Sequence, residues 1–214
     1  MNARIPTNEG FTLVELLVAV AISGIVMASV YSSYYSQQKS YIAQEQVATM
    51  QQNLRNALFH LERDIRMAGY DPTMMAGAGI ANAGSDTMQI TMDLNGDGDT
   101  SDTNETITYS LYVSSGVTRL GKSSGGGPNS PVADNIEALN FVYLDGDRNV
   151  TSTLGSIRSI QVTLVATVGR GDPGYVNTDS FSNQQGTVIL PARNDNLRRR
   201  ALSTEIRCRN LGLH

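Results

Sequence analysis

The first 68 residues carry two different hydrophobic patterns, one after the other. From Phe11 to Val30 nearly every side chain is apolar or small, and the run contains no proline and no charge except Glu15. About 20 apolar residues cross the hydrocarbon core of a bilayer as a helix, so this run predicts a membrane span. A carboxylate inside such a span is costly, and Glu15 therefore requires an explanation.

Beyond Val30 the apolar residues recur every three or four positions, which predicts an amphipathic helix. Gly69 and the following Asp71-Pro72 are typical of a helix C-terminus. We expect one helix from Phe11 to Ala68, roughly 58 residues and about 87 Å long. The apolar stripe of its second half consists of Val47, Met50, Leu54, Leu58, Leu61 and Ile65.

From Thr73 the pattern changes to short segments of alternating apolar and polar residues, which predict strands. These segments are residues 87–94, 105–113, 136–145, 157–168 and 201–209. In the fourth segment Ile160, Val162 and Leu164 alternate with polar residues, which predicts one buried and one solvated face. We expect loops at residues 73–85, 121–131 and 169–186.

These patterns together predict an α+β fold, in which a mostly antiparallel sheet packs against the stripe of the long helix. The expected organisation is a membrane-spanning half-helix at 11–30, an amphipathic half-helix at 31–68 and a globular β-rich head at 69–214.

Composition and charge narrow the possible functions. The chain has 214 residues and a net charge of −4, so it lacks the basic face that nucleic-acid binding usually requires. Residues 198–200 are a run of three arginines, which we expect to be a solvated strand edge or turn. Cys208 is the single cysteine. We expect it to be a small buried apolar side chain.

The segment DLNGDGDTSDTNE, residues 93–105, resembles a calcium-binding loop. Asp93, Asn95 and Asp97 occupy its first, third and fifth positions, and Gly98 occupies the sixth, where a sharp turn is needed. The twelfth position is an asparagine instead of a glutamate, and Glu105 follows one place late. The candidate Ca²⁺ ligands are Asp93, Asn95, Asp97, Asp99, Asp102 and Glu105.

The alternative interpretation of this segment is a plain hairpin loop. Asn95-Gly96 and Asp97-Gly98 are strong turn signals, and no helix is expected on either side. Residues 145–149 repeat the acidic spacing without the glycine. Calcium and the plain turn both stay open, and no other cofactor is expected.

Enzyme motifs give no catalytic candidate. Residues 116–123 match the phosphate-loop pattern G-x-x-x-x-G-K-[ST]. That loop must lead into a helix, whereas a Gly-, Ser- and Pro-rich stretch follows here, so we interpret the match as chance. Of the two histidines, His60 lies on the expected helix and His214 ends the chain. A membrane-anchored extracytoplasmic enzyme is an alternative only by default.

The string GFTLVELLVA, residues 10–19, resembles the processing site of class III signal peptides, which are found in type IV prepilins and pseudopilins. The resemblance implies that residues 1–10 are a leader, removed by a prepilin peptidase between Gly10 and Phe11, and that the new amine of Phe11 is methylated. It also implies that Glu15 pairs with the N-terminal amine of a neighbouring subunit in a filament. A buried charge needs such a partner. The alternative is a glutamate favoured at the first helical turn by the helix dipole.

Four further segments, residues 56–72, 135–147, 157–166 and 198–211, resemble the PilW family of minor pilins. That resemblance implies a non-catalytic subunit that helps to prime pilus assembly near the tip. The implied partners are other minor and major pilins, the inner-membrane assembly platform and the prepilin peptidase. The implied location is the inner membrane, in a single pass with the head outside the cytoplasm, and then the pilus. The J-type minor pseudopilin of type II secretion is the alternative, in which case the final location is a pseudopilus.

Overall fold

The computed structural model describes residues 10–212, and the long helix is its first element. Helix α1 (Leu13–Met67) lies within the predicted range 11–68. A short 3₁₀ turn, η1, occupies Leu154–Ser156. The described strands are β1 (Ile80–Ala83), β2 (Met88–Thr91), β3 (Thr106–Ser114), β4 (Val117–Ser124), β5 (Ser130–Asp134), β6 (Ile136–Leu144), β7 (Ser159–Thr167), β8 (Phe181–Ser182), β9 (Val188–Leu190) and β10 (Arg199–Arg207).

The chain forms two compact units, one ending at Glu45 and one beginning at Gln46. In the first unit, α1 is long and apolar enough to cross a membrane, and none of its most apolar 18-residue window is buried within the chain. The hydroxyls of Ser23 and Ser29 donate to the carbonyl oxygens of Ala19 and Ile25, at 2.7 and 3.0 Å. These polar groups are therefore satisfied inside the helix and need no water.

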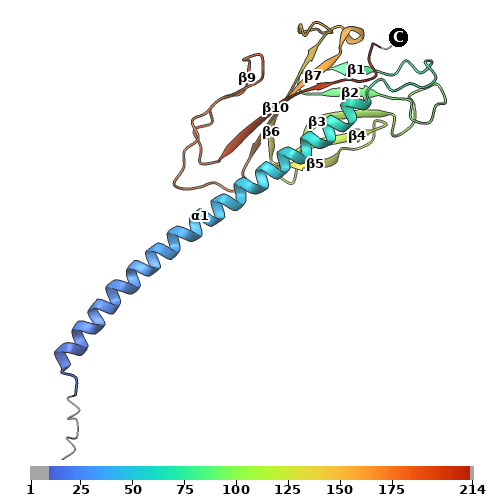
Figure 1. Cartoon of the computed structure of the whole chain (residues 1–214). Coiled ribbons are helices and arrows are strands. Elements are labelled where there is room, and N and C mark those ends of the chain that lie inside the picture. Colours follow the sequence, from blue (N-terminus) through green and yellow to red (C-terminus); the bar gives the residue numbers. More distant parts are fainter. Residues whose placement is uncertain (1–9, 213–214) are drawn as a thin grey trace, which may run out of the picture. The chain divides into compact units, whose positions relative to one another are not determined.

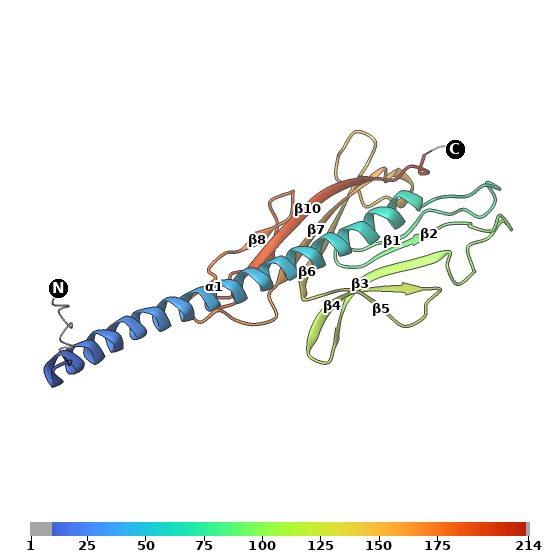
Figure 2. The same cartoon turned by 60° about the horizontal axis from the view of Figure 1, so that its bottom comes forward.

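The second unit contains two antiparallel sheets and a small hairpin. One sheet has the strand order β1-β2-β3-β4-β5, the other has the order β10-β7-β6, and β8 pairs with β9. Figures 1 and 2 show the C-terminal part of α1 lying across both sheets. The predicted α+β fold, with a long helix on antiparallel sheets, is confirmed.

The expected loop at 121–131 is wrong, because it contains the end of β4 and the beginning of β5. Pairing with β3 holds β4 extended, with Tyr109 opposite Lys122 and Ile107 opposite Ser124. Gly121 has a packing role as well, since a Cβ at this position would lie 2.8 Å from the ring of Tyr112. The expected loop at 73–85 is likewise interrupted, by β1.

The helix joins both sheets in one hydrophobic core. Met50, Leu54, Leu61 and Ile65 of the predicted stripe are buried, whereas Val47 and Leu58 are only half-buried. The sheets contribute side chains to the same core cluster, among them Met88, Ile90, Ile107, Tyr109, Leu120, Ile160, Val162 and Leu164.

A buried carboxylate also fixes the helix to the larger sheet. Asp64 is 5 % exposed and lies on the buried face of α1. Its Oδ2 accepts hydrogen bonds from the Tyr109 hydroxyl and from Lys122 Nζ, both at 2.7 Å, and its Oδ1 accepts from Arg63 Nε at 2.8 Å. Burial alone would raise the pKa of Asp64, but the donors from Arg63, Lys122 and Tyr109 outweigh it and the pKa is lowered.

The predicted solvated face of β7 is wrong, because both faces of this strand are buried. The segment that carries β8 and β9 covers the second face, where Val165 packs with Leu190. The polar side chains on that face are hydrogen-bonded instead of hydrated. Gln161 Oε1 accepts from Gln185 Nε2 at 2.8 Å, and Thr163 Oγ1 accepts from the Ser203 hydroxyl at 3.0 Å.

The prediction that the arginine run 198–200 is solvated is wrong for Arg199. The side chain of Arg199 is 2 % exposed and forms ion pairs with Glu137 (2.5 Å) and Asp195 (2.6 Å). Arg199 is buried because it links β10 to β6 and to the preceding loop. Cys208 is buried, as predicted.

Candidate functional site

The predicted cleavage site lies just before the helix. Leader residues 1–9 fall outside the described part of the chain, as does His214. Residues 10–12 precede α1 without regular structure, and Phe11 is 91 % exposed. The bond between Gly10 and Phe11 is therefore exposed and outside regular structure, as cleavage by a peptidase requires.

Glu15 closes a capping box with Thr12, the residue immediately before α1. The backbone N–H and the hydroxyl of Thr12 both donate to Glu15 Oε2 at 2.9 Å, and the Glu15 N–H donates to Thr12 Oγ1 at 3.2 Å. This arrangement satisfies backbone donors that the first turn of a helix leaves unpaired. The sequence analysis missed Thr12, although the spacing T-x-x-E is itself a signal for this cap.

The acidic loop, residues 92–105, connects β2 to β3 in an antiparallel hairpin. No helix borders it, so its secondary structure is that of the hairpin alternative. Asp93 is fully buried. Its carboxylate accepts hydrogen bonds from the N–H groups of Gly96 (2.6 Å) and Gly98 (3.1 Å). Asp93 therefore holds the turn together.

Three carboxylates converge within this loop. One oxygen each from Asp97, Asp99 and Glu105 lie within 4.8 Å of one another. Asn95 borders this cluster, since its amide donates to Asp97 Oδ2 at 2.9 Å and to Asp102 Oδ2 at 2.8 Å. The pKa of Asp102 is raised, first by the charge of Glu105. The structure thus brings together three of the six candidate ligands, places Asn95 and Asp102 beside them, and gives Asp93 a structural task.

Glu105 is the buried member of this cluster, at 2 % exposure. Its Oε1 accepts from the backbone N–H groups of Leu94 (2.8 Å) and Asn95 (3.3 Å). Its Oε2 is buried and has no hydrogen-bond partner among the described residues. An orphaned carboxylate oxygen of this kind is rare in folded proteins.

Two other sequence patterns have local structural explanations. In the loop at 145–149, Asp145 Oδ1 accepts from the N–H groups of Asp147 and Asn149, both at 2.9 Å, which makes a turn. Residues 116–123 form the β3–β4 turn and most of β4. This segment offers no helix N-terminus for a phosphate, so the match to the phosphate loop is chance, as predicted.

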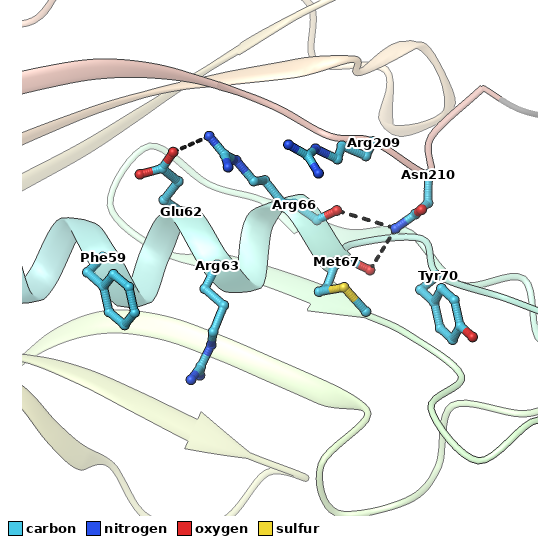
Figure 3. A pocket seen from close by; sticks show the side chains of 8 residues that line it. All are labelled: Phe59, Glu62, Arg63, Arg66, Met67, Tyr70, Arg209 and Asn210. Carbon is cyan, nitrogen blue, oxygen red and sulfur yellow. Dashed lines mark hydrogen bonds and ion pairs between the residues drawn. The ribbon is translucent and has the colours of Figure 1, made fainter.

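A hollow of about 600 Å³ lies beside the last turns of α1 (Figure 3). Asn210 Nδ2 donates to the carbonyl oxygens of Arg66 and Met67, both at 3.3 Å, and so caps the helix end. Glu62 is the acidic side chain of the lining and pairs with Arg66. The sequence analysis missed this hollow because the C-terminal segment, distant in sequence, forms one of its walls.

Comparison with known proteins agrees with the N-terminal part of this description. The family model of the prokaryotic N-terminal methylation motif matches residues 6–31. No curated protein matches the chain. Similar solved structures include a type IV-like pilin from Thermus thermophilus, with 18 % identity and a TM-score of 0.46, covering 75 % of this chain and 97 % of that one.

The methylation motif covers the predicted cleavage site and the beginning of the apolar helix. Together with the long helix on antiparallel sheets, it supports a membrane-anchored, pilin-type filament subunit. For such a subunit, contacts with other pilins and with a prepilin peptidase are implied in general terms.

Proposed function

We propose that this protein is a minor type IV pilin of the PilW type, which primes pilus assembly near the tip. The observation that carries the proposal is the coincidence of the methylation motif at 6–31 with an apolar helix whose side chains are exposed within the single chain. Such a surface needs lipid before assembly and the helices of other subunits afterwards. The distributed resemblance of the head segments to PilW proteins supports the minor-pilin branch.

In this proposal, cleavage and methylation prepare the subunit for assembly. Removal of residues 1–10 creates a charged amine on Phe11, next to the capping box of Thr12 and Glu15. The amine of a neighbouring subunit then binds the Glu15 carboxylate in competition with the Thr12 donors. The amine carries a full positive charge, which the Thr12 N–H and hydroxyl lack, so Coulomb attraction makes it the better partner of the carboxylate in an apolar surrounding.

The proposed role of the protein is therefore to form contacts with other subunits, without substrate turnover. Its helix packs among other minor and major pilins, it is handed over by the inner-membrane assembly platform, and its head lies outside the cytoplasm. The competing branch is the J-type minor pseudopilin of type II secretion, which would use the same N-terminal chemistry.

The deciding experiment is a clean deletion of this gene. In the deletion strain, surface pili are counted and the export of secreted enzymes is measured in parallel. We expect loss of pili with normal export, restored by the wild-type gene. Intact pili with failed export would instead assign the protein to the secretion pseudopilus.

Processing is tested separately, by mass spectrometry of the protein purified from membranes. We expect a mature chain that begins with methylated Phe11. An unprocessed chain would contradict both branches and would return the membrane-anchored enzyme as the working hypothesis.

A further inference from the structure

We propose that the 92–105 loop binds one Ca²⁺ ion through the carboxylates of Asp97, Asp99 and Glu105. All three ligands belong to this loop, so calcium binding does not depend on the proposed function. Oxygens of the three carboxylates lie within 4.8 Å of one another. Ca²⁺ accepts six to eight oxygen ligands in irregular geometry, so backbone oxygens and water complete the shell.

The side chain of Glu105 carries an orphaned oxygen. Glu105 is 2 % exposed, and its Oε2 is buried without a hydrogen-bond partner in the described part of the chain. A buried carboxylate without full compensation is expensive, and nearby like charges increase that cost. A divalent cation removes both penalties, because it ligates the orphaned carboxylate and neutralises Asp97 and Asp99.

The other loop carboxylates are held in position before an ion arrives. Asp97 Oδ1 accepts from the Asp99 N–H at 3.1 Å, and Asp99 Oδ1 accepts from the Ser101 N–H at 2.8 Å. The Asn95 amide fixes Asp97 Oδ2 at 2.9 Å. Such preorganisation lowers the entropy that ion binding would otherwise cost.

The chemistry of the donors selects the metal. The converging groups are all carboxylates, whereas zinc prefers nitrogen and sulfur ligands. Mg²⁺ demands near-ideal octahedral geometry and gives up its water reluctantly. An irregular hairpin loop with acidic side chains suits the larger and more tolerant Ca²⁺.

Ion binding at this loop would also stabilise the segment that follows α1. The Asp93 N–H donates to the Tyr70 carbonyl oxygen at 2.7 Å, and Thr73 Oγ1 donates to Asp93 Oδ2 at 3.2 Å. The loop and the chain just beyond the helix are therefore bonded through Asp93. Calcium then strengthens the end of α1 as well as the hairpin.

The test uses the full-length protein in detergent micelles, stripped with chelator and then titrated with CaCl₂ in a calorimeter and in thermal unfolding. We expect a dissociation constant of roughly 0.1–1 mM, the range of extracellular calcium modules. At ten times this constant the unfolded-to-folded ratio should fall about tenfold.

Two charge-removing variants make the test specific. Glu105→Gln keeps the shape and should weaken calcium binding at least about tenfold. In chelator it should be at least as stable as the wild type, because it removes a repelled charge. Asp147→Asn, in the exposed loop at 145–149, changes net charge equally and should leave the calcium response intact.

Several outcomes would overturn the proposal. They are no stabilisation of the wild type at millimolar CaCl₂, equal stabilisation by MgCl₂, or an undiminished response of Glu105→Gln. Marked destabilisation of Glu105→Gln in chelator would also overturn it, since the charge of Glu105 would then be stabilising in the ion-free loop and would need no cation.

Discussion

In the proposed function, Glu15 has chemically different partners before and after assembly. Within one chain it accepts hydrogen bonds from Thr12 and caps α1. In the proposed filament it binds the amine of a neighbour. The two roles need different properties of the side chain, since capping needs an acceptor oxygen and pairing needs a negative charge.

Substitution with glutamine separates these roles, because glutamine at this position retains a capping box but carries no charge. We expect Glu15→Gln and Glu15→Ala to insert and to be processed, and both to enter pili at least about tenfold less than wild type, as loss of a buried ion pair would cause. Thr12→Ala retains the Glu15 charge and should assemble nearly normally. The measurement is the amount of each variant in sheared pili, and normal assembly of Glu15→Gln would reduce Glu15 to a cap.

Asp64 shows what one buried charge does in the head. We expect Asp64→Asn to lower the free energy of unfolding by about 3 kcal/mol, because the ion pairs with Lys122 and Arg63 are lost and the Lys122 ammonium remains partly buried. Glu62→Gln, which breaks the exposed pair with Arg66, is the control and should cost less than about 1 kcal/mol. Urea unfolding of the full chain in detergent measures both, and equal losses would show that burial of Asp64 has no energetic consequence.

At the scale of elements, the end of α1 depends on a glycine. Gly69 has a backbone φ of +78°, and a Cβ there would collide with the side chain of Leu211. Gly116, in the β3–β4 turn, has a φ of +75° and open space around it. The two positions share the left-handed backbone and differ in packing.

This pair of glycines gives a matched prediction. Both Gly69→Ala and Gly116→Ala should lose about 1 kcal/mol for the left-handed backbone. Gly69→Ala should lower the free energy of unfolding by about 1 kcal/mol more, because Leu211 must be displaced. Thermal unfolding compares the two variants, and equal losses would mean that Leu211 moves aside at no cost.

The elements that the sequence predicts well are those whose signals are local. The stripe from Met50 to Ile65, Gly69 after the helix, and five alternating strands all lie within short windows. In contrast, β4 is extended because it pairs with β3, although Gly121 and Lys122 have weak strand propensity. The second face of β7 is buried by a segment that begins more than ten residues later, which no local pattern reveals.

The acidic loop shows the same limit at a candidate site. The sequence template places calcium ligands at Asp93, Asn95 and Asp97, counted from the start of a helix-flanked loop. In the hairpin, the Met92 N–H donates to the Glu105 carbonyl oxygen at 2.9 Å. This pairing brings the last loop residue back beside Asp97 and Asp99, and the count from Asp93 no longer applies.

At the scale of the whole molecule, acid should weaken the head at two separate links. Asp64 joins α1 to the larger sheet, and Asp195 joins the loop before β10 to Arg199. The pKa of Asp195 is lowered from 3.8 to about 2, chiefly by hydrogen bonds from Arg199, and the pKa of Asp64 is lowered too. A folded-state pKa below the unfolded one adds stability that is complete above the unfolded pKa and is lost as the pH falls through the folded value.

We therefore expect the free energy of unfolding to decline as the pH falls from about 4 to 2. Asp195→Asn should be less stable than wild type at neutral pH and should decline less steeply in acid, because one of the two links no longer titrates. Urea unfolding at a series of pH values measures the slopes. Parallel slopes for variant and wild type would contradict the assigned role of Asp195.

Strand β10 lies at one edge of its sheet, with β7 on its paired side. An edge strand offers backbone groups to which a strand of another copy can add, and charged side chains oppose such addition. Arg200 and Arg207, near the two ends of β10, are exposed, so two copies approaching edge to edge bring like charges together. Growth by sheet extension is thereby disfavoured at this edge. Even at high concentration, copies of the chain would therefore associate through the exposed apolar side chains of α1 and not through β10.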